Sequence, residues 1–202
     1  MDFKSVPILF LLILSGCSAA LVSYSSNPYQ LLHNASALLD LERPTPAEHL
    51  ITQALELCEK TPDPLCLAEG YRAYGNFFMS AALNGQWKGH YINNGFRDID
   101  ASYDKRYIKA IEYFDKALPI FLNSKKYDSV TNVKLNTGFG YQANGETAKA
   151  CNAFDASLTA NNENLRLNPT AKIAIPATYS SYGHYIAAVK LDAGCPASGD
   201  SL

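Results

Sequence analysis

The cysteines are the residues whose positions indicate chemistry most directly. The chain has 202 residues and five cysteines, and the first, Cys17, ends the segment Leu14-Ser15-Gly16-Cys17. An apolar stretch from Val6 to Leu14 precedes it, with Lys4 ahead of that stretch. Such a stretch is too short to cross a bilayer as a helix but is typical of a secretory signal peptide.

The segment Leu14-Ser15-Gly16-Cys17 resembles the lipobox of bacterial lipoproteins. The resemblance implies that residues 1–16 are a signal peptide and that the Cys17 sulfur carries a diacylglyceryl group. It also implies that a fatty acid such as palmitate acylates the new amino terminus. Several acyl chains anchor a protein stably, and Ser18 in place of Asp implies the outer membrane, on its periplasmic face. The alternative is an ordinary secreted protein cleaved near residues 18–20.

The four other cysteines favour disulfides over a metal site; they are Cys58, Cys66, Cys151 and Cys195. An even number in an oxidising compartment predicts two disulfides, for which three pairings exist. Zinc is the rival interpretation, but the chain has no CxxC motif and no His within four residues of any of the four. We therefore expect neither a metal nor a cofactor.

No motif indicates catalysis. The chain lacks GxSxG, HExxH and a glycine-rich phosphate loop, and its histidines are scattered at positions 33, 49, 90 and 184. Peptidoglycan cleavage would need a carboxylate placed on a rigid cleft, whereas the glutamates fall at ordinary helix positions. The formal net charge of −2 predicts no basic face for nucleic acid. We expect a non-enzymatic protein without a nucleic-acid partner.

Helix signals dominate the chain after a small, polar tether over residues 17–27. Thr45-Pro46-Ala47-Glu48 predicts a capping box, and Asp63-Pro64 predicts a second helix start. Apolar spacing predicts further helices over about 104–122, 127–143, 146–161 and 174–192. Pro119 should kink or end its helix near Leu118. The fold class is therefore all-α over residues 28–195, followed by a tail at 196–202.

One pattern occurs three times along these helices. Tyr71-x-x-Tyr74-Gly75-x-x-Phe78 recurs as Tyr179-x-x-Tyr182-Gly183-x-x-Ile186 and, more weakly, as Lys134-x-x-Thr137-Gly138-x-x-Tyr141. Matching second-helix positions follow at Ala110, Phe114, Ala117 and Leu118, and at Ala150, Phe154, Ser157 and Leu158.

This pattern resembles the tetratricopeptide repeat, in which the small residue lets the second helix pack closely. The resemblance implies antiparallel helix pairs stacked as a short solenoid, interrupted by an insertion at about 84–103. The alternative is an unrelated helical bundle with glycines at close contacts.

The resemblance also implies a partner-binding groove formed by the first helices of the repeats. The positions that match are Glu69, Arg72, Ala73, Asn76, Met79, Asn132, Leu135, Asn136, Phe139, Gln142, Ser180, Ser181 and His184. Asn side chains both donate and accept hydrogen bonds and can hold an extended peptide backbone.

The insertion at about 84–103 is a second candidate for a binding site. Its aromatic residues Trp87, Tyr91 and Phe96 either contact a partner or fold back as a lid over a helix.

The expected helix order selects one disulfide pairing. Cys58 ends one helix and Cys66 begins the next, across a turn with Pro62 and Pro64. Cys151 lies early in its helix and Cys195 just after the terminal one, so antiparallel packing brings them together. We predict Cys58–Cys66 and Cys151–Cys195.

These features together predict a periplasm-facing outer-membrane lipoprotein that serves as a scaffold or adaptor for an envelope protein or peptide, in assembly or secretion. One alternative is an immunity lipoprotein that neutralises a toxin delivered to the periplasm. Another is an envelope-stabilising protein that binds peptidoglycan.

Overall fold

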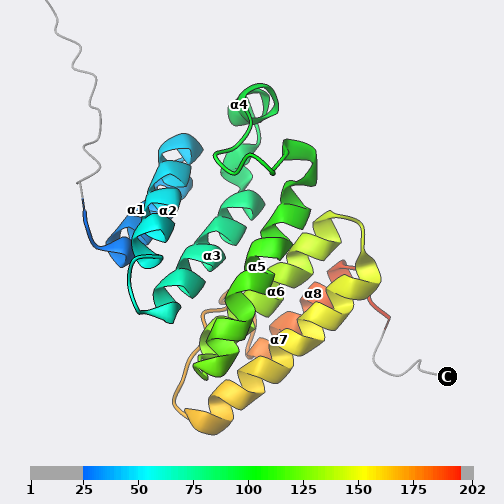
Figure 1. Ribbon diagram of the computed structural model, residues 1–202. Coiled ribbons are helices and arrows are strands. Elements are labelled where there is room, and N and C mark those ends of the chain that lie inside the picture. The colour runs from blue at the N-terminus through cyan, green and yellow to red at the C-terminus, as the bar shows by residue number, and fades with distance from the viewer. Residues whose placement is uncertain (1–24, 197–202) are drawn as a thin grey trace, which may run out of the picture.

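Residues 25–196 are described by the computed structural model, and within that range the protein is all-α with no strand (Figure 1). The proposed signal peptide and Cys17 lie outside the described residues. Among the described residues there are eight α-helices, and two 3-10 turns, Ala81–Leu83 and Tyr103–Lys105, flank the fourth of them. The helices are α1 Pro28–Asp40, α2 Pro44–Cys58, α3 Pro64–Met79, α4 Gln86–Asn94, α5 Arg106–Asn123, α6 Tyr127–Ala143, α7 Thr147–Leu167 and α8 Tyr182–Asp192.

The predicted N-terminal cap is present at the start of α3 but not at the start of α2. Asp63 caps α3, because its side chain accepts the amide of Leu65 at 3.0 Å and Pro64 needs no such partner. The capping box predicted at Thr45 is wrong. The helix α2 begins at Pro44, the residue before it makes no side-chain cap bond, and Glu48 turns into the interior instead.

Two prolines affect the helix ranges differently. The predicted range of about 104–122 is confirmed by α5, and because the helix continues through Pro119 to Asn123, an end near Leu118, one of the two outcomes expected there, is excluded. Pro119 lies on the exposed side of the helix, where water can satisfy the carbonyl that loses its hydrogen bond. In contrast, α8 begins at Tyr182 rather than near 174, because Pro176 interrupts the preceding segment.

Apart from the short α4, each helix packs against the next one along the chain. The helix α3 therefore packs mainly against α5 rather than α4 (Figure 1). Contacts one helix further on join α1 to α3 and α3 to α6. A large apolar core runs from α1 to the first half of α6 and includes Ala160 of α7, and a smaller cluster joins α6, α7 and α8. The helix α3 thereby contacts both α1 and α6.

Two glycines of the recurring pattern are covered by a phenylalanine of another helix: Gly75 of α3 by α5 and Gly138 of α6 by α7. A Cβ at Gly75 would lie 2.4 Å from the ring of Phe114, and a Cβ at Gly138 would lie 2.4 Å from the ring of Phe154. In the part of the chain that the structure describes, a Cβ at Gly183, the third glycine, would have only the Ser181 hydroxyl within 4 Å, at 3.8 Å. A side chain at position 75 or 138 would collide with the covering ring, so glycine is favoured at both positions.

We expect Gly138→Ala to lower the free energy of unfolding by about 1–3 kcal/mol, because the new methyl group overpacks Phe154. Gly183→Ala is the matched control and should leave stability equal or raise it by up to about 1 kcal/mol, since alanine favours helix and meets open space. Chemical denaturation of both variants measures the difference. Equal stabilities would contradict the close contact at Gly138.

Both predicted disulfides are confirmed. Cys58 and Cys66 are bonded with Cα atoms 5.3 Å apart and join the end of α2 to the start of α3. Cys151 and Cys195 are bonded with Cα atoms 5.7 Å apart and join the start of α7 to the residues after α8. The helix order from which the pairing was predicted is therefore present.

Candidate functional site

Five of the predicted groove residues form a continuous polar array across α3 and α6. Arg72 donates from Nε to Glu69 Oε2 at 2.8 Å and from Nη1 to Asn132 Oδ1 at 3.4 Å. Asn136 Nδ2 donates to Asn76 Oδ1 at 2.9 Å and lies 3.3 Å from Asn132 Oδ1. The two helices thus present a row of amides ending in an ion pair, which we call the polar array.

A pocket of about 480 Å³ adjoins the polar array, between α1 and α3. Ile51 of α2 and Ala35 of α1, both buried, contribute apolar surface to it. Glu69, Arg72 and Asn76 belong both to this pocket and to the array. The surface therefore extends without a break from α1 across α3 to α6.

The residues that α1 contributes to the pocket were not among the predicted site residues. Besides Ala35, they are Tyr29, Leu32, His33, Ser36 and Leu39. Their spacing repeats that of the groove positions in α3, from Glu69 to Met79, and in α6, from Asn132 to Gln142. The start signal Asn27-Pro28 followed by this spacing could have identified them, since Asn27 caps α1 through the amide of Tyr29.

Tyr29 fixes the rim of the pocket to the start of α3. Its hydroxyl donates to Asp63 Oδ2 at 2.6 Å. Burial of the hydroxyl, together with this hydrogen bond, raises the pKa of Tyr29 to about 12. The same bond lowers the pKa of the Asp63 carboxyl. At neutral pH the tyrosine is therefore a protonated, fixed donor, and the cap of α3 stays ionised.

Three other predicted groove residues lie apart from the array. Phe139 packs edge-on against Phe154, with ring centroids 5.4 Å apart, and so supports the helix pair. Gln142 Nε2 is 3.3 Å from Asp192 Oδ2 at the end of α8. His184 Nδ1 is 2.5 Å from the Ser180 hydroxyl at the start of α8.

The insertion folds back as a lid, which was one of the two alternatives. Tyr91 and Phe96 stack with centroids 4.5 Å apart, and they are 2% and 7% exposed. Trp87 donates its indole N–H to the Glu42 carbonyl at 2.8 Å. Tyr91 and Phe96 are thus enclosed and unavailable to a partner, which corrects their assignment as contact residues. Aromatic side chains on a solvated loop would leave a large apolar area in water, so burial is favoured.

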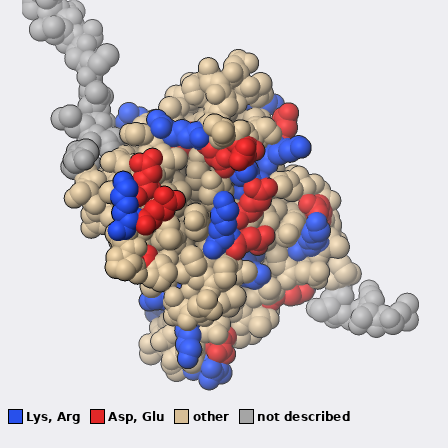
Figure 2. Space-filling view, viewed as in Figure 1, with Lys and Arg blue, Asp and Glu red and all other residues tan. Residues whose placement is uncertain are grey.

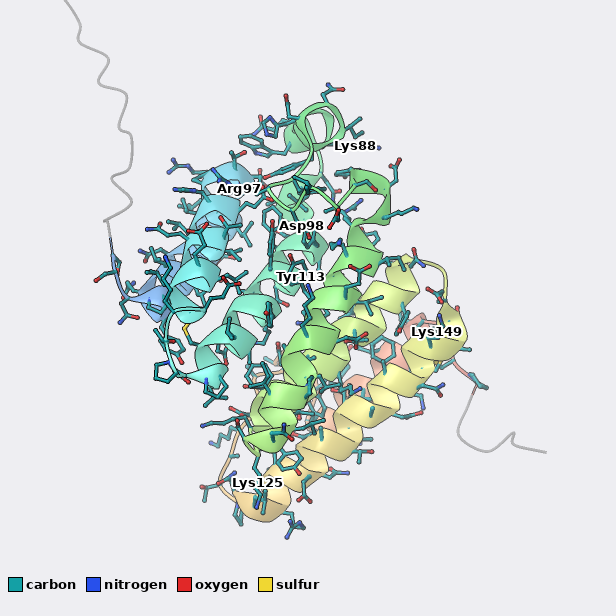
Figure 3. All side chains as sticks on the ribbon, in the orientation of Figure 1. Lys88, Arg97, Asp98, Tyr113, Lys125 and Lys149 are labelled. Carbon is teal, nitrogen blue, oxygen red and sulfur yellow. A yellow bond between two sulfur atoms is a disulfide. The ribbon has the colours of Figure 1, made fainter. Side chains whose placement is uncertain are left out.

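A buried carboxylate, Glu48, holds the lid in place. Its Oε1 accepts the Tyr74 hydroxyl at 2.9 Å and the Arg97 amide at 2.7 Å. Burial raises the pKa of the Glu48 carboxyl, while these two hydrogen bonds lower it. The Asp98 amide donates to the Tyr74 hydroxyl and the Tyr113 hydroxyl donates to Asp98, so the segment is fixed to α3 and α5 (Figure 3).

The position of Glu48 argues for a structural role. A raised pKa is the property of a general acid, but this carboxyl is only 3% exposed and both its donors belong to the fold. The expectation that Glu48 occupies an ordinary helix position is wrong. No local signal identifies it, since Tyr74 and Arg97 lie far along the chain.

Within residues 25–196, no three His, Cys, Asp or Glu side chains lie close enough together to hold a metal ion. In the same range, no helix is long and apolar enough to cross a membrane. Acidic and basic side chains are interspersed on the face drawn in Figure 2. No family model, no curated protein and no solved structure matches the chain.

Proposed function

We propose that this protein is a non-enzymatic lipoprotein of the outer membrane, facing the periplasm, whose helical domain binds a protein or peptide partner. The lipobox-like segment ending at Cys17 supports the membrane attachment. The two disulfides suit the oxidising periplasm.

The proposal includes a short solenoid similar to tetratricopeptide repeats. Three helix pairs would compose it, α1 with α2, α3 with α5 and α6 with α7, and α8 would be a terminal half-repeat. Support comes from the order in which the helices pack, including the contacts of α1 with α3 and of α3 with α6. The recurring contacts of Gly75 with Phe114 and of Gly138 with Phe154 are a second support.

The observation that carries the binding role is the continuous surface made by the pocket and the polar array. Its pocket offers apolar area for a side chain, and Asn76, Asn132 and Asn136 offer amide donors and acceptors for a peptide backbone. The ion pair of Arg72 with Glu69 stays partly exposed, with side-chain exposures of 32% and 23%, so either charge can meet a charged partner. An extended segment lying across α1, α3 and α6 fits this surface best.

Affinity capture of the lipidated protein from its native envelope tests this role. We expect Asn136→Ala to reduce recovery of the partner at least about tenfold, because it breaks the array at its centre. Asn152→Ala, the same change at an exposed position on α7, is the control and should recover the partner fully. Thermal melting confirms that both variants fold.

Two results would count against the proposal. Equal recovery by the two variants would exclude the polar array as the binding surface. Recovery of a toxin that originates outside the envelope would contradict the adaptor role and favour an immunity lipoprotein.

A further inference from the structure

The helix α8 carries the third copy of the glycine pattern from Tyr182 onward, with Gly183 in its first turn, but lacks the contact that the other two copies make. Gly75 lies under a phenylalanine ring of α5, and Gly138 lies under one of α7. Among the described residues, 25–196, a Cβ at Gly183 would meet only the hydroxyl of Ser181, at 3.8 Å. The space that a second helix fills at the two earlier glycines is therefore open at α8.

A ridge that no other part of residues 25–196 covers extends from this open position along α8. Gly183, Ala187 and Leu191 follow one another at intervals of four residues, so they form one row on the helix surface. Ala187 is exposed, and the Leu191 side chain is 79% exposed. A different side of α8, with Tyr182 and Ile186, is buried against α7. An apolar ridge of this kind on a terminal helix is unusual, since terminal helices of repeat proteins normally present a polar outer face.

The two covered glycines indicate what chemistry would cover the third. The helix over Gly75 carries Ala110, Phe114, Ala117 and Leu118, and the helix over Gly138 carries Ala150, Phe154, Ser157 and Leu158. Both show a small residue, an aromatic four positions later, a second small residue three positions after that, and then leucine. Each aromatic ring seats directly on the glycine, where no side chain intervenes.

We propose that the ridge of Gly183, Ala187 and Leu191 binds an amphipathic helix of a partner protein, which seats an aromatic side chain on Gly183. The bound helix completes the terminal half-repeat of α8. This site is separate from the pocket and the polar array and uses none of their residues.

A labelled peptide with the sequence of residues 146–163, with Cys151→Ser, is the probe, because this is the helix that covers Gly138. Its binding to the mature full-length protein is followed by fluorescence anisotropy. We expect saturable binding that weakens at least tenfold, about 1.4 kcal/mol, when the peptide carries Phe154→Ala. Gly183→Ala in the protein should weaken binding equally, because its methyl group occupies the place of the ring, while its melting temperature is not lowered.

Several outcomes would overturn the proposal. These are the absence of saturable binding, equal binding of the two peptides, or unchanged affinity in Gly183→Ala. Self-association of the protein that Gly183→Ala abolishes would assign the ridge to a second copy of this chain instead. Asn136→Ala, which tests the polar array, should leave peptide binding unchanged, so failure of one site is distinguishable from failure of the other.

Discussion

Replacing Cys151 and Cys195 together by alanine is expected to lower the free energy of unfolding by about 4 kcal/mol. The bond closes a loop with a sequence separation of 44 residues, and the chain-entropy model gives that magnitude for such a loop. The bridge also holds α8, which packs mainly on α7 and follows a long segment without helix. We therefore expect amide exchange in α8 to accelerate more than exchange in α3 or α6.

The second disulfide provides the matched control. Cys58 and Cys66 are separated by only 8 residues, so their joint replacement by alanine should cost less, about 2.5 kcal/mol on the same model. Denaturant titration of the two double variants, with exchange measured on both, gives the comparison. Equal losses of stability, or unchanged exchange in α8, would contradict the view that the longer loop clamps the terminal helix.

Features that depend on short-range patterns were predictable from the sequence. The start of α3 was predicted because Asp63 and Pro64 act within one helical turn. The range of α6 was predicted correctly, and the disulfides followed from where helices end. The close approach at Gly138 was also predictable, since a glycine between large residues leaves one gap on a helix surface.

Features that depend on distant partners were not predictable from one sequence. Glu48 matched a capping box by its spacing from Thr45, but Tyr74 and the Arg97 amide draw it into the interior. The match to the repeat pattern predicted that Asn76 and Asn136 share a surface. Their hydrogen bond was not predictable, because it joins residues 60 positions apart and depends on how α3 packs on α6. The pocket was not predicted because α1, which lines it, was not recognised as a helix. The apolar residues of α1 directly follow a tether-like segment.

The proposed lipid anchor leads to the other large effect. We expect Cys17→Ala to move essentially all of the protein from the membrane fraction to the soluble fraction. Without the thiol there is no site for the diacylglyceryl group, and the described residues contain no helix that could cross the bilayer. Several acyl chains hold a protein stably, whereas none leaves only weak polar contacts with the membrane surface.

Fractionation of the envelope after a high-salt wash measures this release, and metabolic labelling with a radioactive fatty acid shows whether the chain is acylated. Ser18→Ala is the control, because it changes the neighbouring residue and keeps the thiol, so this variant should stay labelled and bound. Unlabelled wild-type protein would contradict the lipobox interpretation outright. An unlabelled Cys17→Ala variant that still sediments with outer membranes would show that a protein partner suffices to hold the domain there, and the polar array and the α8 ridge would be the two surfaces to alter next.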